Sequence, residues 1–358
     1  MPKNNHLYRI VEQFIETASK CRIEPFGSGL INDTFRVELL ELGGSMLLQR
    51  LNHYVFHQPA AVMANIQLIA DHLNRQGYQS VILQPILTRH GELLHVDIEG
   101  NHWRMFPFFE NTTSIDRAID PEQVYVAGRA YGEFAHALAG LDAKTAGIVE
   151  TIPGFHDSVN RLTFFEETLV SGIADRLTEA AEEVNTMKAN QHLFYYISEL
   201  PLPNRITHND TKINNVLFEK QTGTVCGVID WDTIMPGTIL SDFGDMVRTM
   251  APTYDENHTN IAEIDLIIPY FEALCQGFLP VVQDFLTSIE LKNMVKGAQW
   301  IVLEQALRFL TDYLKGDLYY KTTYPQQNLF RTRNQLALYK ALKREEAILE
   351  GIVLKVLG

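Results

Sequence analysis

The chain has 358 residues, and its 44 acidic and 30 Lys or Arg side chains give a formal net charge of -14. This acidic balance excludes nucleic acid and anionic membrane surfaces as main partners, because both require clustered cations. The length is sufficient for two lobes that each have a core.

The cysteines and the N-terminal residues indicate the cellular compartment in which the protein functions. Cys21, Cys226 and Cys275 are widely separated and match neither a disulfide framework nor a zinc site. Residues 1–6 lead into an amphipathic pattern rather than a signal peptide, and no apolar stretch is long enough to span a bilayer. We therefore expect a reduced, cytoplasmic protein with no membrane or nucleic-acid partner. We also expect a monomer.

The first hundred residues predict a small sheet with two helices. Tyr8–Ala18 has helical periodicity, and Ala60–Asn74 predicts a longer helix that ends near Gly77 and packs on the sheet. Short strands between glycine-bearing turns are predicted at Ile23–Phe26, Thr34–Leu39, Met46–Leu51, Val81–Leu87 and Leu93–Ile98.

A glycine-rich turn, Gly27-Ser28-Gly29, lies between the first two predicted strands. Backbone amides in such a turn can bind phosphate oxygens, and the position between strands favours this function. A short glycine pair is also an ordinary hairpin turn, so that alternative stays open.

The apolar, aromatic run Trp103–Phe109 is broken by Pro107. Its place after the sheet suits a hinge whose backbone groups could bind adenine, with Phe106 and Phe108 on either side of the proline. A buried edge strand is the alternative interpretation, and the two are compatible.

Beyond Asn111 the patterns are mostly helical, and Arg331–Leu357 predicts a docked terminal helix. Other helices are predicted at Pro121–Leu141, Val159–Leu169, Ile173–Met187 and His192–Leu200. The whole pattern predicts an α+β chain of two unequal lobes. Residues 1–106 form an N-lobe with a small antiparallel sheet and one long helix, and residues 107–358 form a larger, mostly helical C-lobe.

The most specific pattern lies in the segment 205–232. Asp210 follows an apolar approach, Lys212 is two residues further on, and Asn215 is five residues further on. Asp230 ends a second apolar run. The offsets supply a proton acceptor, a phosphate contact and two ligands for a metal ion.

These residue types suit phosphoryl transfer, which depends on positioning and electrostatics rather than on covalent chemistry. A carboxylate such as Asp210 can accept a proton from an acceptor hydroxyl. An amide oxygen beside a carboxylate suits Mg²⁺, a hard cation that prefers oxygen ligands. The turn residues 221–224 predict a hairpin that brings Asn215 and Asp230 to one metal site.

Three neighbouring residues have other interpretations. We expect His208 to be structural and to hold the loop by hydrogen bonds. Asp232 is either a further metal or substrate contact or a solvated turn carboxylate. Asp242 begins the letters Asp-Phe-Gly, but it opens the helical pattern Phe243–Met250, so a helix N-cap or first-turn charge explains it better than a metal ligand.

His208-x-Asp210 with Asn215 and the downstream Ile229–Asp232 resembles the aminoglycoside phosphotransferase and choline kinase family, which shares the protein-kinase-like fold. The longer stretches that resemble its N-acetylhexosamine 1-kinase branch are Gly27–Phe35, Thr207–Asn215, Ile229–Gly237 and Arg308–Asp317. Further similarity through Arg333 extends the resemblance over nearly the whole chain.

The resemblance implies phosphorylation of the anomeric hydroxyl of N-acetylglucosamine or N-acetylgalactosamine, with ATP as co-substrate and Mg²⁺ as the metal. It implies that Asp210 is the base and that Lys212 lies near the transferred phosphate. It implies that Asn215 and Asp230 bind magnesium. The sugar contacts that it implies are Thr233, Arg308 and Tyr319.

Two positions depart from the family pattern. Leu30 stands where the sugar kinases carry a histidine, which removes a polar group near the substrate. The third strand offers Gln49 or Arg50 where protein kinases place a lysine, which the sugar kinases also lack. The alternatives are a kinase for choline, ethanolamine, homoserine or an aminoglycoside, and a non-catalytic homologue that binds a nucleotide or sugar.

Overall fold

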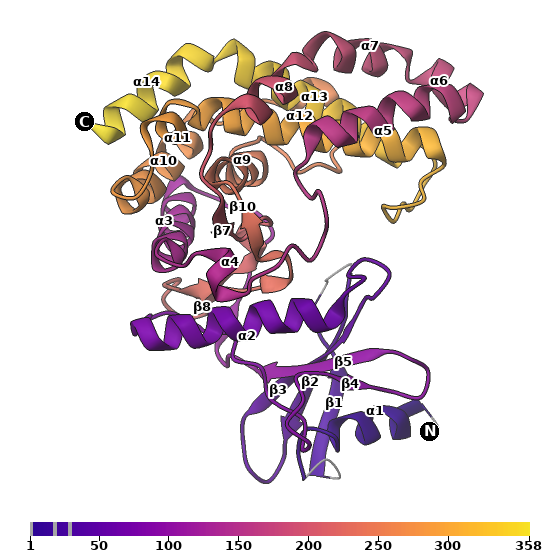
Figure 1. Cartoon of the computed structure of the whole chain (residues 1–358), viewed down its shortest axis with the longest axis vertical. Coiled ribbons are helices and arrows are strands. Elements are labelled where there is room, and N and C mark those ends of the chain that lie inside the picture. Colours follow the sequence, from indigo (N-terminus) through magenta and orange to yellow (C-terminus); the bar gives the residue numbers. More distant parts are fainter. Residues whose placement is uncertain (1–2, 17–19, 28–30) are drawn as a thin grey trace. The chain divides into compact units, whose positions relative to one another are not determined.

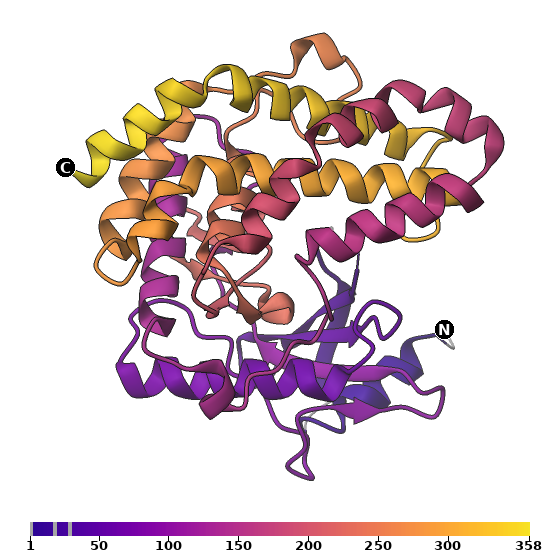
Figure 2. The ribbon, with the colours of Figure 1, turned by 45° about the horizontal axis from the view of Figure 1, so that its top comes forward.

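The computed structural model describes residues 3–16, 20–27 and 31–358 (Figures 1 and 2). The chain forms two compact units. The sheet unit comprises residues 1–114, 140–153 and 217–236, and the helical unit comprises residues 115–139, 154–216 and 237–358. Because the two units interleave along the chain, the lobe boundary at 106/107 stays a prediction.

A five-stranded sheet lies at the centre of the sheet unit, in the order β1-β2-β3-β5-β4 (Figure 1). Every neighbouring pair in this sheet is antiparallel, as predicted. The strands are β1 (Cys21–Pro25), β2 (Asp33–Leu39), β3 (Ser45–Leu51), β4 (His95–Val96) and β5 (His102–Pro107).

One face of this sheet packs against helix α1 (Lys3–Val11) and the turn after it. Side chains alternate across a strand, so each strand contributes every second residue to this core. The buried residues of the cluster are Ile10, Val11, Phe14, Cys21, Val37, Leu39, Leu48, Trp103 and Met105.

The other face of the sheet carries helix α2 (Pro59–Gln76), the predicted long helix (Figure 1). Pro59 suits the first turn because the missing N–H would have no partner there. Gly77 ends the helix in the left-handed conformation, with φ 67°, and its N–H donates to the carbonyls of the last turn. Met63, Ile66, Ile69 and other apolar residues at helical spacing are buried.

Three predictions for the sheet unit are wrong in extent. The first helix ends at Val11. The N–H groups of Gln13 and Phe14 donate to carbonyls only three residues earlier, which tightens the turn. Residues 17–19 of the predicted helix lie outside the described residues. Residues 81–87 form no strand apart from a bridge at Ile86, because Pro85 has no N–H to donate. Of residues 93–98 only β4 is a strand, since Asp97 turns the chain by accepting backbone N–H groups.

A second, three-stranded sheet has the order β6-β8-β9, with strands β6 (Thr112–Thr113), β8 (Val216–Glu219) and β9 (Val225–Val228). The predicted hairpin is confirmed, since Glu219 N–H donates to Thr224 O at 2.8 Å and Gly223 has φ 69°. The short helix α4 (Ala143–Ala146) also belongs to the sheet unit.

The helical unit consists of short strands and many helices. Its strands are β7 (Arg205–Thr207) and the end of β10 (Met235–Gly237). Its helices are α3 (Pro121–Leu138), α5 (Ser158–Ser171), α6 (Ala174–Glu179), α7 (Ala181–Asn190), α8 (His192–Glu199), α9 (Ile239–Met250), α10 (Ile268–Val282), α11 (Ser288–Lys292), α12 (Met294–Lys315), α13 (Gln327–Arg344) and α14 (Glu346–Leu357).

Helix α12 is the centre of this unit, with 18 of its 22 residues buried. It runs beside α13 and also contacts α5 and α9 (Figure 2). The predicted terminal helix is in fact two helices, α13 and α14, because the helix is interrupted at Glu345. The predicted helix 173–187 is likewise split, at Ala180. No helix in the described ranges combines the length and apolar character that crossing a bilayer requires.

Helices α3 and α10 approach each other closely through glycine. A Cβ added at Gly277 would overlap the Tyr125 carbonyl, and one at Gly128 would lie 2.8 Å from the Leu274 side chain. Glycine at these positions therefore sets the separation between the two helices.

We expect Gly277→Ala to lower the free energy of unfolding by about 1–3 kcal/mol, because the new methyl group must push α3 away from α10. Urea denaturation measures this change. The control is Gly351→Ala in α14, where a Cβ meets nothing within 4 Å; helix propensity there favours Ala by up to about 1 kcal/mol. A stable Gly277→Ala protein would contradict the close packing.

Candidate active site

The loop that follows β7 carries three of the predicted site residues, all in the helical unit. The Lys212 Nζ lies 2.9 Å from Asp210 Oδ1. The Asn215 Nδ2 donates to Asp210 Oδ2 at 3.1 Å and to the Asp210 carbonyl at 2.9 Å. The structure thus brings the predicted base, phosphate contact and amide ligand together around one carboxylate, which is 26% exposed.

The pKa of Asp210 is set by opposing effects. Burial raises it, but the ammonium of Lys212, with smaller contributions from His208 and Arg248, brings the pKa below the ordinary value for Asp. The carboxylate is therefore ionised at neutral pH, which is the form that can accept a proton.

Asp242 holds this loop by hydrogen bonds. Its two carboxylate oxygens accept the backbone N–H groups of His208 at 2.9 Å and Asn209 at 2.7 Å, and its carbonyl accepts the Thr211 hydroxyl at 2.7 Å. Asp242 lies in the first turn of α9, whose N-cap is Thr238, so the predicted first-turn charge is confirmed. Burial raises its pKa to about 7, although the two amide hydrogen bonds act in the opposite direction.

His208 is structural, as predicted. Its Nδ1 accepts the backbone N–H of Asp210 at 3.3 Å, and its ring meets Tyr131 and Phe134 edge to face. The side chain is 1% exposed, so it cannot reach a substrate without leaving its pocket.

The Asp230 segment belongs to the sheet unit. Asp230 has φ 61° and precedes a single 3-10 turn, η3 (Trp231–Thr233). The buried Trp231 closes this turn by donating its ring N–H to Val228 O at 3.0 Å. Thr233, a predicted sugar contact, is the last residue of the turn, and so it lies on the segment that carries the predicted metal ligand.

Asp232 is not a solvated turn residue. It is 4% exposed and forms a two-pronged ion pair with Arg104 of β5, at 2.5 and 2.8 Å. Sequence reasoning missed Arg104, although an arginine in the middle of an apolar strand is a signal of a buried, paired charge.

The predicted nucleotide contacts are partly described. Gly27 has φ 78°, a conformation that favours glycine, whereas Ser28, Gly29 and Leu30 lie outside the described residues. The Phe106 side chain is 3% exposed, at the end of β5. The Phe108 N–H donates to Ser45 O, and its ring packs between Phe26 and the Arg36 guanidinium. The Phe108 amide is therefore engaged within the sheet unit, and the adenine contact of the hinge backbone stays a prediction.

Arg308 and Tyr319, two of the predicted sugar contacts, lie in the helical unit. The Arg308 guanidinium lies over the rings of Phe155 at 5.2 Å and Tyr320 at 5.8 Å and donates to Gln305 at 3.2 Å. No carboxylate of the described chain lies within ion-pair distance of it. Tyr319 is 59% exposed and meets the Tyr320 ring at 4.8 Å.

The backbone at Tyr319 is held by one carboxylate. Asp312 of α12 accepts the N–H groups of Leu318, Tyr319 and Tyr320 at 2.8–3.0 Å, and the amide of Asn328 also donates to it. This arrangement positions the Tyr319 side chain while leaving it exposed.

Arg161 and Glu304 are further members of the Arg308 region that sequence reasoning missed. Glu304 is 1% exposed, accepts hydrogen bonds from His156 and Ser158, and lies 3.9 Å from Arg161. Burial and the nearby Arg308 lower the pKa of Arg161. No short motif connects these residues, because they come from α5, α12 and the chain before α5.

Asn215 fits a metal ligand chemically. Its hydrogen bonds to the Asp210 carbonyl and carboxylate both use the amide nitrogen, and the amide oxygen is the atom that can bind a cation. Within the described ranges no three His, Cys, Asp or Glu side chains form a metal-binding group, so any cation here needs amide or substrate oxygens as well.

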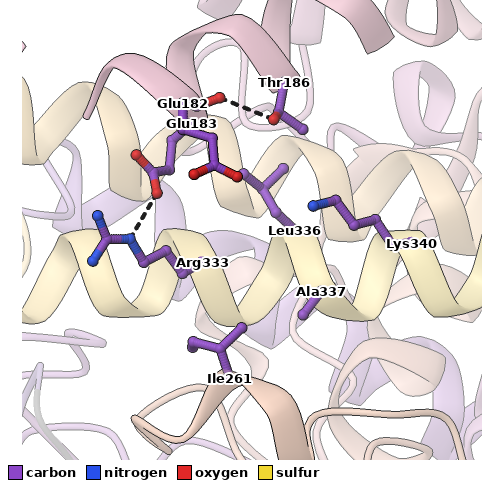
Figure 3. Close-up of a pocket in the computed structure, with 8 residues that line it drawn as sticks. All are labelled: Glu182, Glu183, Thr186, Ile261, Arg333, Leu336, Ala337 and Lys340. Carbon is purple, nitrogen blue, oxygen red and sulfur yellow. Dashed lines mark hydrogen bonds and ion pairs between the residues drawn. The ribbon is translucent and has the colours of Figure 1, made fainter. Parts of the chain in front are cut away.

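A surface hollow of about 210 Å³ lies between α7 and α13 (Figure 3). The residues that line it are Glu182, Glu183, Thr186, Ile261, Arg333, Leu336, Ala337 and Lys340. Arg333 donates to Glu183 at 2.6 Å and neutralises its buried carboxylate. None of the predicted site residues lines the hollow, so we do not place the acceptor there.

The sheet unit and the loop that carries Asp210 define a phosphotransferase with a kinase-like fold. A model of the phosphotransferase enzyme family matches residues 22–274, which is more than half of the chain. The protein therefore belongs to the phosphotransferase enzyme family known as APH, and it is a small-molecule kinase.

Solved structures of small-molecule kinases share this fold. An amicoumacin kinase in complex with AMP-PNP, Ca²⁺ and Ami is 13% identical, with a TM-score of 0.62 over 94% of this chain and 96% of that chain. A microcompartment-associated aminopropanol kinase is 13% identical, with a TM-score of 0.61 over 97% and 98%. Choline kinase from Cryptosporidium parvum Iowa II is 12% identical, with a TM-score of 0.56 over 98% and 97%.

We expect Asp242→Ala to lower the free energy of unfolding by about 1–3 kcal/mol, because two buried backbone N–H groups lose their acceptor. Urea denaturation measures the loss, and hydrogen exchange at His208 and Asn209 locates it. Asp284→Ala, at an exposed position, is the control. Unchanged exchange at the two loop amides would show that Asp242 does not hold the loop.

Proposed function

We propose that this protein is an ATP-dependent kinase that phosphorylates the anomeric hydroxyl of N-acetylglucosamine or N-acetylgalactosamine and releases the sugar 1-phosphate. Membership of the phosphotransferase family supports the reaction type. The sequence resemblance and the environment of Arg308 support the acceptor.

The observation that carries this acceptor class is the Arg308 guanidinium, which is flanked by aromatic rings and has no carboxylate partner within the described residues. A cation in this state favours a neutral acceptor that offers carbonyl and hydroxyl oxygens, and it repels a cationic acceptor. Amino alcohols and aminoglycosides are cationic at neutral pH, whereas an N-acetylhexosamine is neutral and has an amide carbonyl. The exposed Tyr319 hydroxyl and Thr233 complete the proposed sugar contacts.

ATP is the proposed phosphate donor, and the amicoumacin kinase solved with AMP-PNP and Ca²⁺ supports a nucleotide with a divalent cation. We assign Gly27, Ser28 and Gly29 to the phosphates, because backbone amides of such a turn suit anions. Phe106 and Phe108 are assigned to the adenine.

Asn215 and Asp230 are the proposed ligands of Mg²⁺, through an amide oxygen and a carboxylate. A bound Mg²⁺ supplies positive charge to the oxygens of the transferred phosphoryl group. The left-handed backbone of Asp230 and the hydrogen bonds of the Asn215 amide orient these two side chains before the cation binds.

In the proposed reaction the ionised Asp210 accepts the proton of the anomeric hydroxyl. That oxygen forms a bond to the γ-phosphorus, the bond to the β–γ bridging oxygen breaks, and ADP leaves with the electron pair. Lys212 lies 2.9 Å from Asp210, so the same residue can contact the transferred phosphate. The proposed base, Asp210, and the proposed phosphate contact, Lys212, thus act from one loop.

We expect Asp210→Asn to lower kcat by at least about 10²-fold, because general-base catalysis typically contributes 10² to 10⁴-fold. ATP affinity measured by calorimetry stays unchanged. In the wild type the base itself is lost when the pH drops through the lowered pKa of Asp210, whereas Asp242, whose pKa is raised to about 7, is already partly protonated near neutral pH. Near-normal turnover of the Asn variant would contradict the assignment of the base.

We expect Arg308→Ala to raise the KM for the sugar about tenfold or more and to leave the KM for ATP unchanged, because a hydrogen bond to a charged group contributes about 1.5–3 kcal/mol. Steady-state kinetics measures both constants. Arg344→Ala, an exposed arginine of α13, is the matched control. Equal changes in both KM values would indicate a general disturbance instead of a sugar contact.

A coupled ADP-release screen tests the function as a whole. The acceptors are N-acetylglucosamine, N-acetylgalactosamine, glucose, choline, ethanolamine, homoserine and kanamycin, and NMR locates the phosphate in the product. The proposal expects turnover with the two N-acetylhexosamines and a phosphate on the anomeric carbon. If a cationic acceptor is turned over preferentially, the proposed N-acetylhexosamine acceptor is wrong. If ADP is released with none of the acceptors, a non-catalytic homologue is favoured.

A further inference from the structure

Arg104 is a buried cation in the middle of the sheet. It is 2% exposed and lies between Trp103 and Met105, which face the α1 core, so its own side chain faces α2. A guanidinium in this position is costly unless every donor finds a partner.

The partners of Arg104 come from three elements of the sheet unit. The two terminal nitrogens of Arg104 donate to the carboxylate of Asp232 in η3, at 2.5 and 2.8 Å. Its Nε donates to the side-chain oxygen of Gln49 in β3, at 3.0 Å. The remaining contacts are the Met63 sulfur on α2, at 3.7 Å, and the Phe106 ring, at 5.2 Å. Two parallel hydrogen bonds to one carboxylate fix the orientation as well as the charge.

The network continues from Asp232 to the strand that follows the glycine-rich turn. The Asn32 Nδ2 donates to Asp232 at 2.8 Å, and the Asn32 side-chain oxygen accepts the N–H of Asn52 at 3.0 Å. In the same way Gln49 donates to Thr34 of β2 at 3.1 Å. Asp232 is therefore connected to the open end of the β2–β3 hairpin, where β2 begins and β3 ends.

The segment that carries Asp230 is held at two points. Asp232 is fixed by Arg104, and the carbonyl of Ile234 accepts the Asn65 amide of α2 at 3.0 Å. Asp230 itself is in a left-handed conformation, with φ 61°, which Asp adopts more readily than most non-glycine residues but still at some cost. The ion pair with Arg104 is the charged contact of the two that hold the segment.

Protein kinases hold the corresponding region with a lysine on the third strand and a glutamate on the long helix. Here the third strand offers Gln49, which is neutral and is directly opposite Arg104. Arg50, the other candidate, pairs instead with the exposed Asp33. The buried cation of this sheet therefore comes from β5, and its carboxylate comes from η3 rather than from α2.

We propose that Arg104, through Asp232, is the positioning residue that keeps Asp230 in the orientation for binding a nucleotide-bound divalent cation. Arg104 acts through Asp232 because its own side chain is buried and each of its three nitrogens donates a hydrogen bond within the sheet unit. This inference rests on the proposed function only in assigning the cation to Asp230.

The test measures binding rather than turnover. Calorimetry gives the affinity for Mn²⁺·ADP and, separately, for ADP with EDTA, in the full chain and in Arg104→Met, Arg104→Lys and Asp232→Asn. We expect each variant to weaken Mn²⁺·ADP binding by roughly 10 to 100-fold, the usual effect of removing a group that orients a metal ligand. Binding of ADP without metal stays unchanged. Lys does not restore the affinity, because it cannot make the two-pronged pair.

The double variant Arg104→Met/Asp232→Asn distinguishes a pair that acts together from two independent losses. We expect its loss to be no larger than that of either single variant, since both remove the same interaction. Arg22→Met, which removes an exposed ion pair with Glu38 elsewhere in the sheet, is the matched control. Hydrogen exchange at residues 230–234 increases in the Arg104 variants but not in the control.

The outcomes separate this inference from the proposed function. If the wild type binds no Mn²⁺·ADP, the proposed kinase function fails. If the wild type binds it and the folded Asp232→Asn and Arg104→Lys variants bind it equally well, the positioning role of Arg104 is overturned. Should Arg104→Met fail to fold, these two milder variants still decide the question, because each keeps a charged or polar group at its site.

Discussion

Buried carboxylates need hydrogen-bond donors or cations, and in this protein those carboxylates hold the segments that carry the proposed site residues. Asp242 holds the loop of Asp210 by accepting two backbone N–H groups. Asp232 holds the segment of Asp230 through Arg104. Asp312 holds the backbone at Tyr319 by accepting three N–H groups. Because an unsatisfied buried carboxylate is costly, each of these segments is fixed by the same requirement that stabilises the fold.

This arrangement separates the proposed base and sugar contact from the groups that hold their segments. Asp210 and Tyr319 keep exposed surface, whereas Asp242 and Asp232 are almost fully buried. The difference follows from their partners, since the carboxylates of Asp242 and Asp232 are occupied by backbone amides and by a two-pronged arginine. Preorganisation of this kind suits phosphoryl transfer, in which the protein contributes mainly position and charge.

The region around Arg308 differs in character from the loop of Asp210. Arg308 is flanked by aromatic rings, and the nearby Glu304 is occupied by His156, Ser158 and Arg161. The nearby carboxylate of Glu304 is therefore already paired. The guanidinium of Arg308 is the group that keeps N–H donors for a ligand.

The sequence alone predicted the antiparallel sheet, the long helix, the hairpin after Asn215 and the grouping of Asp210, Lys212 and Asn215, because these depend on local periodicity, turn residues and short spacing. It also favoured a first-turn role for Asp242, from its position at the start of a helix. Only the tertiary structure decided the partner of Asp232, since Arg104 is 128 residues away and no local pattern specifies that contact. The same holds for Arg161 and Glu304, and for the divided terminal helix, whose break at Glu345 lies within an uninterrupted helical pattern. Local segments follow from local sequence, whereas the pairing of buried charges depends on which elements pack together.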